Sequence, residues 1–255
     1  NKMFKLYIFN LLSLMGMEIL FKLLSHMTIF DYSLLRIFLG INIISLLISF
    51  VLSYFNDKIG YIISLIFNMV FSIYAFIQMG FLSFIGVYMS LNTSSQLGAV
   101  KDYIKDFLNS FSKSYYLIFI PFILSLLYVI YYFNKDKVQE NNMFLLRSRL
   151  RKERLIKLGI TSILLCLFSI FYNNSLSVSD SLQTVNNKSL FINPNIPSLA
   201  VKNFGLIGYG LDDVKIFLNP IEDDNQIYYA SNEDQVTDKT RTFDDTVWNQ
   251  FITEE

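Results

Sequence analysis

Histidine, cysteine and alanine are scarce in this chain of 255 residues, which contains one His, one Cys and four Ala. The lone Cys166 excludes a disulfide framework within the chain, so it does not indicate the redox compartment. The lone His26 has no second histidine with which to share a metal ion or a proton. We therefore interpret it as a side chain at a membrane interface. The few alanines amid much Ile, Asn, Lys and Phe are typical of an AT-rich bacterial genome.

Apolar residues dominate the rest of the composition. Hydrophobic residues make up 53% of the chain, with 25 Phe and 16 Tyr, and the mean hydropathy is positive. A soluble domain of this length could not keep so much apolar surface away from water. The composition therefore predicts an all-α membrane protein with several spans.

Five apolar runs are each about twenty residues long, enough to cross about 30 Å of hydrocarbon. The predicted transmembrane helices cover residues 3–24, 34–55, 59–84, 115–133 and 155–172. Residues 1–172 then form a transmembrane domain. Residues 173–255 form a polar tail that is rich in Asp and Glu, which we interpret as an extracytoplasmic linker.

A basic segment, residues 135–157, predicts which way the spans point. It holds eight Lys or Arg against three Asp or Glu, and a predicted span flanks it on each side. Short basic loops stay in the cytoplasm because positive charge resists translocation. The chain is thus predicted to lie in a bacterial cell membrane with its N-terminus inside and its tail outside. Nucleic-acid binding is excluded, because the charges flank spans and no aromatic platform accompanies them.

Two segments outside the spans show helical spacing of apolar residues. In residues 90–114 the stripe is Leu97, Val100, Ile104, Phe107, Leu108 and Phe111. It predicts either an amphipathic interfacial helix or an ordinary surface helix. In residues 198–218 the stripe is Val201, Phe204, Ile207, Leu211, Val214 and Leu218. It predicts one amphipathic helix that rests on the membrane or on the bundle, with Asp212 and Asp213 pointing away. Gly205, Gly208 and Gly210 indicate close packing, because glycine weakens an isolated helix.

Polar residues within the spans supply the candidate site. Glu18, Lys22, Arg36 and Gln78 are predicted to lie at similar depth, near the outer ends of the first three spans. Ionisable groups in hydrocarbon normally face a partner or a wet cavity. One hypothesis is a pocket for an anionic lipid headgroup, with the cations on its phosphate. The alternative is a structural Glu–Arg or Glu–Lys pair. Asn68 is predicted to form a hydrogen bond between helices.

The tail contains no residue pattern typical of catalysis or metal binding. It has no His and no Cys, and the pairs Asp223–Asp224 and Asp244–Asp245 lack the spacing and glycine of a calcium loop. We predict no cofactor or metal site in this chain. Residues 173–189 are interpreted as a connector, and residues from 221 onward as a solvated acidic linker that ends in a short helix at 244–252.

Two segments are informative together with the spacing of the five spans: AVKDYIKDF at 99–107 and NPNIPSLAVKNFGLIGYGLDDVK at 193–215. In these features the chain resembles the lipoteichoic acid synthase family of membrane-anchored bacterial phosphoglycerol transferases. The resemblance implies transfer of glycerol phosphate from phosphatidylglycerol to a cell-envelope polymer, in cell wall biogenesis. It also implies a sulfatase-like extracytoplasmic domain with a threonine nucleophile and manganese. That domain would follow this chain, which begins at Asn1 without Met and is expected to be part of a longer protein.

The resemblance supplies no catalytic residue within these 255 positions. Its implied partners are membrane lipids, phosphatidylglycerol above all, and the protein's own extracytoplasmic domain. The alternative is a non-enzymatic membrane module such as a scaffold, a sensor anchor or a transporter subunit. The gene distinguishes the two: an enzyme requires several hundred further residues after Glu255.

Overall fold

The computed structural model describes residues 2–91, 103–136, 149–177, 186–194 and 196–218. These residues form helices joined by turns and short loops, and no strand occurs among them. The predicted all-α class is therefore confirmed. The acidic pairs and the helix predicted at 244–252 lie outside the described residues.

Within the described part of the chain, five helices are long and apolar enough to cross a membrane, as predicted. They are α1 (Lys2–Leu24), α2 (Tyr32–Leu52), α3 (Asp57–Phe84), a fourth span made of the 3₁₀ helix η3 (Lys113–Phe119) with α6 (Ile120–Asp136), and α7 (Arg149–Leu176). Pro121 stands in the first turn of α6, where its missing N–H has no partner within the helix to lose. The sidedness of the spans stays a prediction.

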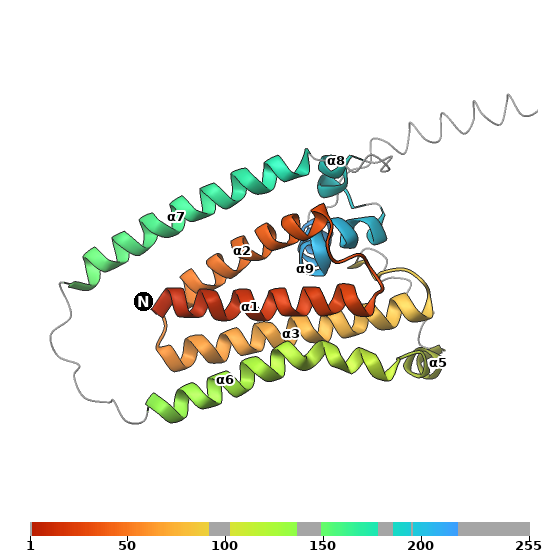
Figure 1. Ribbon diagram of the computed structural model, residues 1–255, viewed down its shortest axis with the longest axis horizontal. Coiled ribbons are helices and arrows are strands. Elements are labelled where there is room, and N and C mark those ends of the chain that lie inside the picture. Colours follow the sequence, from red (N-terminus) through yellow and green to blue (C-terminus); the bar gives the residue numbers. More distant parts are fainter. Residues whose placement is uncertain (1, 92–102, 137–148, 178–185, 195, 219–255) are drawn as a thin grey trace, which may run out of the picture. The chain divides into compact units, whose positions relative to one another are not determined.

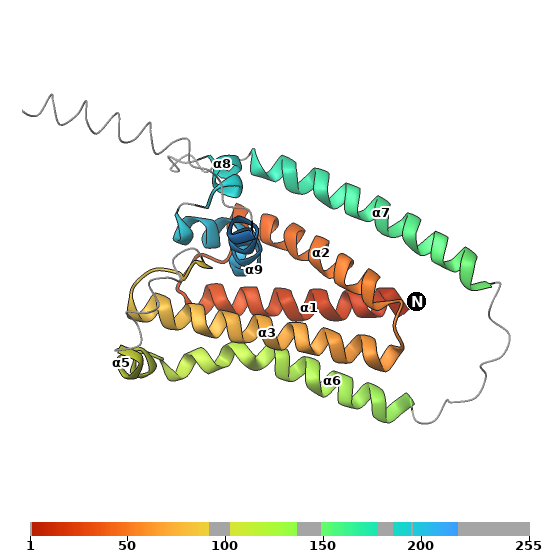
Figure 2. The same ribbon diagram turned by 180° about the vertical axis from the view of Figure 1, so that it is seen from behind.

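The five spans lie side by side in both views (Figure 1, Figure 2). Helix α1 contacts α2, α3 and α6, whereas α7 contacts α2. Large apolar side chains point away from these contacts: Leu12 is 67% exposed, Ile66 56% and Ile163 63%. Such surfaces suit contact with lipid tails, because exposing apolar side chains to water is unfavourable.

The start of α1 and the turn between α2 and α3 lie at one end of the spans. The ammonium of Lys2 is 2.8 Å from a carboxylate oxygen of Asp57, and it also donates to the Phe55 carbonyl. We call this end the Lys2 end. At the other end α1 stops at Leu24, and His26 adopts a left-handed conformation (φ 55°) while the Met27 N–H donates to the Lys22 carbonyl at 2.9 Å. This geometry is a common helix stop.

The amphipathic helix predicted within residues 90–114 is tested only in part, because residues 92–102 lie outside the described residues. Only α5 (Ile104–Asn109) forms there among the described residues, and Leu97 and Val100 lie outside them. The Phe107 ring packs against Phe81 of α3 at 5.1 Å, whereas Ile104 and Leu108 are at least half exposed. Of the four described members of the stripe, Phe107 and Phe111 therefore pack against phenylalanines of α3, and the other two do not form a buried face with them.

Among the residues that the structure describes after the spans there are two helices, α8 (Asn187–Ile192) and α9 (Pro197–Leu218). They lie at the end where α1 stops and α2 begins, which we call the α9 end (Figure 1). Apolar side chains of α9, including Val201, Phe204 and Ile207, share a buried cluster with Leu14 and Met17 of α1. One compact unit extends from Asn1 to Phe217. Helices α8 and α9, which the sequence assigns to the linker, thus belong to the same compact unit as the spans.

Asn68 does not form the predicted interhelical hydrogen bond within the described residues. It lies near the middle of α3 and is 2% exposed, and neither atom of its amide has a partner there. By contrast, Asn10 of α1 donates to the Ser49 hydroxyl of α2 at 3.1 Å. Spacing along one helix cannot show which polar side chain meets a partner on the next.

Candidate functional site

Helix α9 consists of two helical parts joined at Gly205. This residue has φ 78° and ψ 170°, a region of backbone space that essentially only glycine occupies. The amphipathic helix predicted for residues 198–218 is therefore present but divided at Gly205. The break gives α9 a second helix start at Leu206, whose first N–H groups have no carbonyl partner within the helix.

Glu18 of α1 supplies the missing partners. Its Oε2 accepts a hydrogen bond from the Leu206 N–H at 3.0 Å, and its Oε1 accepts one from the Ile207 N–H at 2.6 Å. Glu18 is 1% exposed. A carboxylate at a helix start is stabilised both by these N–H donors and by the helix dipole. A side chain of the first span thus caps a helix nearly 190 residues further along the chain.

Close approach at this contact requires the glycine. A Cβ at position 205 would lie 2.9 Å from Oε2 of Glu18 and 3.0 Å from its Oε1. Any side chain would displace the carboxylate from its two donors. Gly210 has a similar neighbour, because a Cβ there would lie 3.0 Å from the hydroxyl of Tyr74. Gly205 and Gly210 therefore meet close neighbours on the spans, whereas the neighbour of Gly208 is Phe204 of α9 itself.

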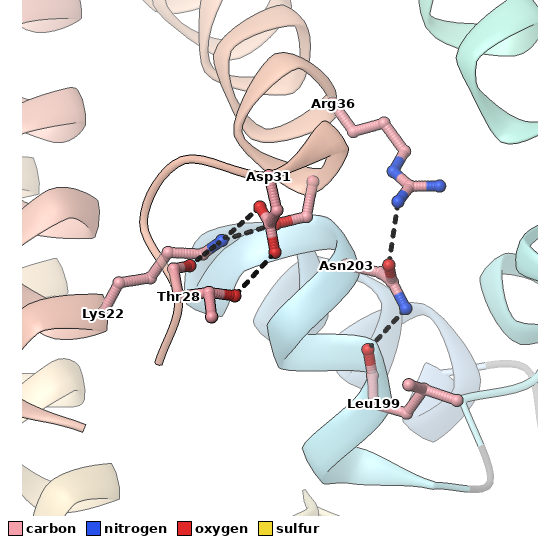
Figure 3. Close-up of polar contacts among 7 residues, drawn as sticks. Lys22, Thr28, Asp31, Arg36, Leu199 and Asn203 are labelled. Carbon is pink, nitrogen blue, oxygen red and sulfur yellow. Dashed lines mark hydrogen bonds and ion pairs between the residues drawn. The ribbon is translucent and has the colours of Figure 1, made fainter. Parts of the chain in front are cut away.

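Arg36 joins α2 to the first part of α9. Its Nη2 donates to Oδ1 of Asn203 at 2.9 Å, and the Asn203 amide in turn donates to the Leu199 carbonyl at 3.1 Å (Figure 3). Arg36 is 1% exposed and Asn203 is fully buried. The neutral Asn203 amide thus presents an oxygen to the guanidinium while its own N–H is satisfied inside α9.

Lys22 points toward the turn between α1 and α2. Its ammonium lies 3.4 Å from Oδ1 of Asp31 and also donates to the Ser33 hydroxyl and the Thr28 carbonyl (Figure 3). Burial alone would raise the pKa of Asp31, but hydrogen bonds from Ser33, Lys22 and Thr28 outweigh it and hold this pKa below its ordinary value. The ion pair therefore fixes the turn that precedes α2.

Gln78 holds the loop after α3. Its amide donates to the Met89 carbonyl at 2.9 Å and accepts from the Met89 N–H at 2.8 Å. The Tyr209 hydroxyl of α9 also donates to the Met89 carbonyl, at 3.3 Å. Gln78 therefore reaches α9 through a backbone group that both of them bind.

Asp212 and Asp213 are buried, which corrects the prediction that they point away from the bundle. They are 9% and 4% exposed. Asp213 accepts hydrogen bonds from the Ser90 hydroxyl at 2.5 Å and the Leu91 N–H at 2.7 Å. Burial raises the pKa of Asp212 to about 6, while Lys215 opposes the shift. Asp213 therefore faces the loop after α3, because the break at Gly205 turns the second part of α9.

The same break divides the apolar stripe of α9. Val201, Phe204 and Ile207 are 1–4% exposed, whereas Leu211 is 46%, Val214 43% and Leu218 70% exposed. The predicted apolar face is therefore buried up to Ile207 but exposed beyond it. A change of direction in the backbone cannot be inferred from a constant spacing of apolar residues.

The four candidate residues share one end of the spans, and each is 1% exposed. Glu18 and Arg36 bind α9 directly and Gln78 reaches it through Met89; we call these three residues the α9 seat. Lys22 forms its ion pair with Asp31. The lipid-headgroup pocket stays a prediction, since the hydrogen bonds described here go to protein groups. Among the described residues no group of three or more His, Cys, Asp or Glu could hold a metal ion.

Three residues of this site were not identified from the sequence: Asn203, Gly205 and Asp213. Gly205 was one of three glycines, and its role depends on a carboxylate in a distant span. Asn203 and Asp213 look like ordinary polar residues of a helix outside the membrane. No protein-family model matches the chain, and no curated protein or solved structure matches it either. Function is therefore inferred from the residues, the described geometry and the family resemblance.

Proposed function

We propose that this chain is the membrane anchor and linker of a lipoteichoic-acid-synthase-like enzyme, which transfers glycerol phosphate from phosphatidylglycerol to a cell-envelope polymer. The resemblance supplies the reaction, and the chemistry is assigned to an extracytoplasmic domain outside this chain. One observation carries the anchoring part. The α9 seat ties α9 to α1 and α2 through the contacts of Glu18 with Leu206 and Ile207, and of Arg36 with Asn203.

A tethered enzyme that acts on a lipid has to reach the headgroups at a set height. A freely jointed linker would leave that height variable, whereas a capped and buried helix fixes the point from which the next segment begins. The buried carboxylate and guanidinium contribute to this rigidity, because breaking either contact leaves polar groups unsatisfied in a dry site. In this proposal α9 is therefore a positioning element, and its residues take no part in the chemistry.

The natural gene and its full-length product test the proposal. The reading frame should continue past Glu255 into several hundred residues with a threonine nucleophile among Asp, His and Glu. The full-length protein should release diacylglycerol from fluorescent phosphatidylglycerol in the presence of manganese, and the 255-residue chain should release none. A natural stop codon after Glu255 would favour the non-enzymatic membrane module instead.

Sidedness is tested separately by labelling. Cysteines are introduced at Asn142 and Asn195 in a Cys166→Ser background, and intact cells are treated with an impermeant thiol reagent. The positive charge of residues 135–157 predicts that position 142 is protected and position 195 is labelled. The reverse pattern would place α9 in the cytoplasm and contradict the proposed function.

A further inference from the structure

A groove runs along the spans between α1 and the fourth span. Its volume is 630 Å³, within the range of about 300–1,000 Å³ that is typical of small-molecule sites. Its lining includes Lys5, Ser13 and Gly16 of α1 and Pro121, Leu124 and Ser125 of α6. Leu12, which also lines the groove, is 67% exposed and Leu124 is 61% exposed. The groove therefore opens on the face of the spans that lipid would contact.

The floor of the groove is made of small residues whose polar groups are satisfied. The Ser125 hydroxyl donates to the Ser13 hydroxyl at 3.0 Å, and this contact is buried. Further along, a Cβ at Gly16 would lie 3.6 Å from the Pro121 ring, so the two helices approach each other closely there, and the lining continues to Leu20 and Ile120. A helix, about 10–12 Å across with its side chains, would rest on the leucine rims. A single hydrocarbon chain is thin enough to reach the floor.

The other end of the groove carries a positive charge. Lys5 lines it and is exposed. The neighbouring Lys2 is bonded to Asp57 and to the Phe55 carbonyl, and within the described part of the chain no ion pair includes Lys5. Lys5 thus complements an anionic group at the end of an apolar slot.

The groove is long enough for an acyl chain that crosses one lipid leaflet. From Lys5 to Leu20, which both line it, the helix rises by about 22 Å, whereas half of the hydrocarbon thickness of a bilayer is about 15 Å. An acyl chain whose phosphate lies at Lys5 would therefore end within the groove, near Gly16. In the predicted sidedness Lys5 lies at the cytoplasmic leaflet, opposite to the α9 end.

We propose that this groove binds one acyl chain of an anionic phospholipid, with the headgroup phosphate at Lys5. The site does not rest on the proposed function, because its headgroup end lies at the Lys2 end and its lining includes no residue of the α9 seat.

Photolabelling of the purified chain in lipid nanodiscs tests the site. The probe is phosphatidylglycerol with a diazirine on its acyl chain, and phosphatidylcholine with the same chain is the neutral comparison. Labelled peptides should come from the groove faces of α1 and α6. Lys5→Gln should lower labelling by phosphatidylglycerol about fivefold, the change expected for one basic residue near a lipid phosphate. Lys58→Gln, at an exposed lysine of α3 near the same end, should leave it unchanged.

A second variant tests the acyl chain itself. Ser13→Phe fills the floor and should abolish labelling of the groove, whereas Ile66→Phe, on the exposed face of α3, should not. Labelling that survives Lys5→Gln, or equal labelling by both lipids, overturns the headgroup assignment. Labelling that survives Ser13→Phe overturns the acyl assignment, and a crosslink between two chains through this groove shows a protein occupant instead. None of these measurements uses diacylglycerol release, so a negative photolabelling result would not contradict the proposed function.

Discussion

The carboxylate of Glu18 lies where a side chain at position 205 would have to be: a Cβ on Gly205 would come within 2.9 Å of its Oε2. Glu18 belongs to the first span and Gly205 to a helix after the last one. The contact lets one buried carboxylate cap the second part of α9 through Leu206 and Ile207. The orientation of α9 on the spans thus depends on a glycine and an acid that are remote in sequence.

Gly205→Ala should loosen α9. The backbone conformation alone should cost about 1–3 kcal/mol, and displacement of the Glu18 carboxylate adds to this. Hydrogen exchange of the α9 amides and the thermal stability of the purified protein measure the effect. Gly86→Ala is the matched control, because Gly86 also has a positive φ (83°) but has open space around it. The two substitutions should differ by the contribution of the Glu18 contact.

A double substitution isolates that contribution. Glu18→Ala removes the obstacle to a side chain at position 205 but leaves two buried N–H groups unpaired, at about 1–3 kcal/mol each. In the Glu18→Ala background, Gly205→Ala should therefore cost less than it does in the native protein. Additive effects would show that the two residues do not interact.

Phe204→Asp and Leu211→Asp should have unequal effects. Phe204 is 4% exposed and its loss should cost about 3–5 kcal/mol, even before the burial of a charge is counted. Leu211 is 46% exposed, so its replacement should change stability by about 0.5 kcal/mol. Limited proteolysis of α9 in each variant is the measurement. Equal protease sensitivity of the two variants would indicate that residues 198–218 form one continuous helix with one buried face, as the apolar spacing predicts.

Stability should fall as pH rises from about 4 to about 6, through Asp212. Burial raises its pKa from an ordinary value of 3.8 to about 6. Between these values the folded protein binds more protons than the unfolded chain, so stability decreases with increasing pH. Asp212→Asn should remove this part of the pH dependence, and thermal melts of both proteins across the window measure the difference. Identical profiles would contradict a buried carboxyl at this position.

The sequence predicted the class and the five spans because long apolar runs report directly on burial in lipid. It also predicted that Glu18, Arg36 and Gln78 lie at one end of the bundle, since the rise per residue of a helix converts residue number into depth. The partners of these residues could not be predicted. Whether Glu18 meets Arg36, a lipid or the backbone of α9 depends on tertiary packing, and the direction of α9 after Gly205 depends on a backbone angle that no spacing encodes.

Asn68→Leu should stabilise the protein. Asn68 is 2% exposed in α3, and its amide has no hydrogen-bond partner within the described residues. An apolar side chain of similar size removes the desolvation cost, about 1–3 kcal/mol in water-soluble proteins and less in membranes, where polar contacts average about 0.6 kcal/mol. Asn10→Leu is the matched control: Asn10 is equally buried but bonded to Ser49 at 3.1 Å, so its loss leaves a hydroxyl unpaired and should destabilise. Thermal melts in one detergent compare both variants with the native chain. A destabilised Asn68→Leu would mean that the Asn68 amide has a bonding partner, such as a buried water molecule, inside the bundle.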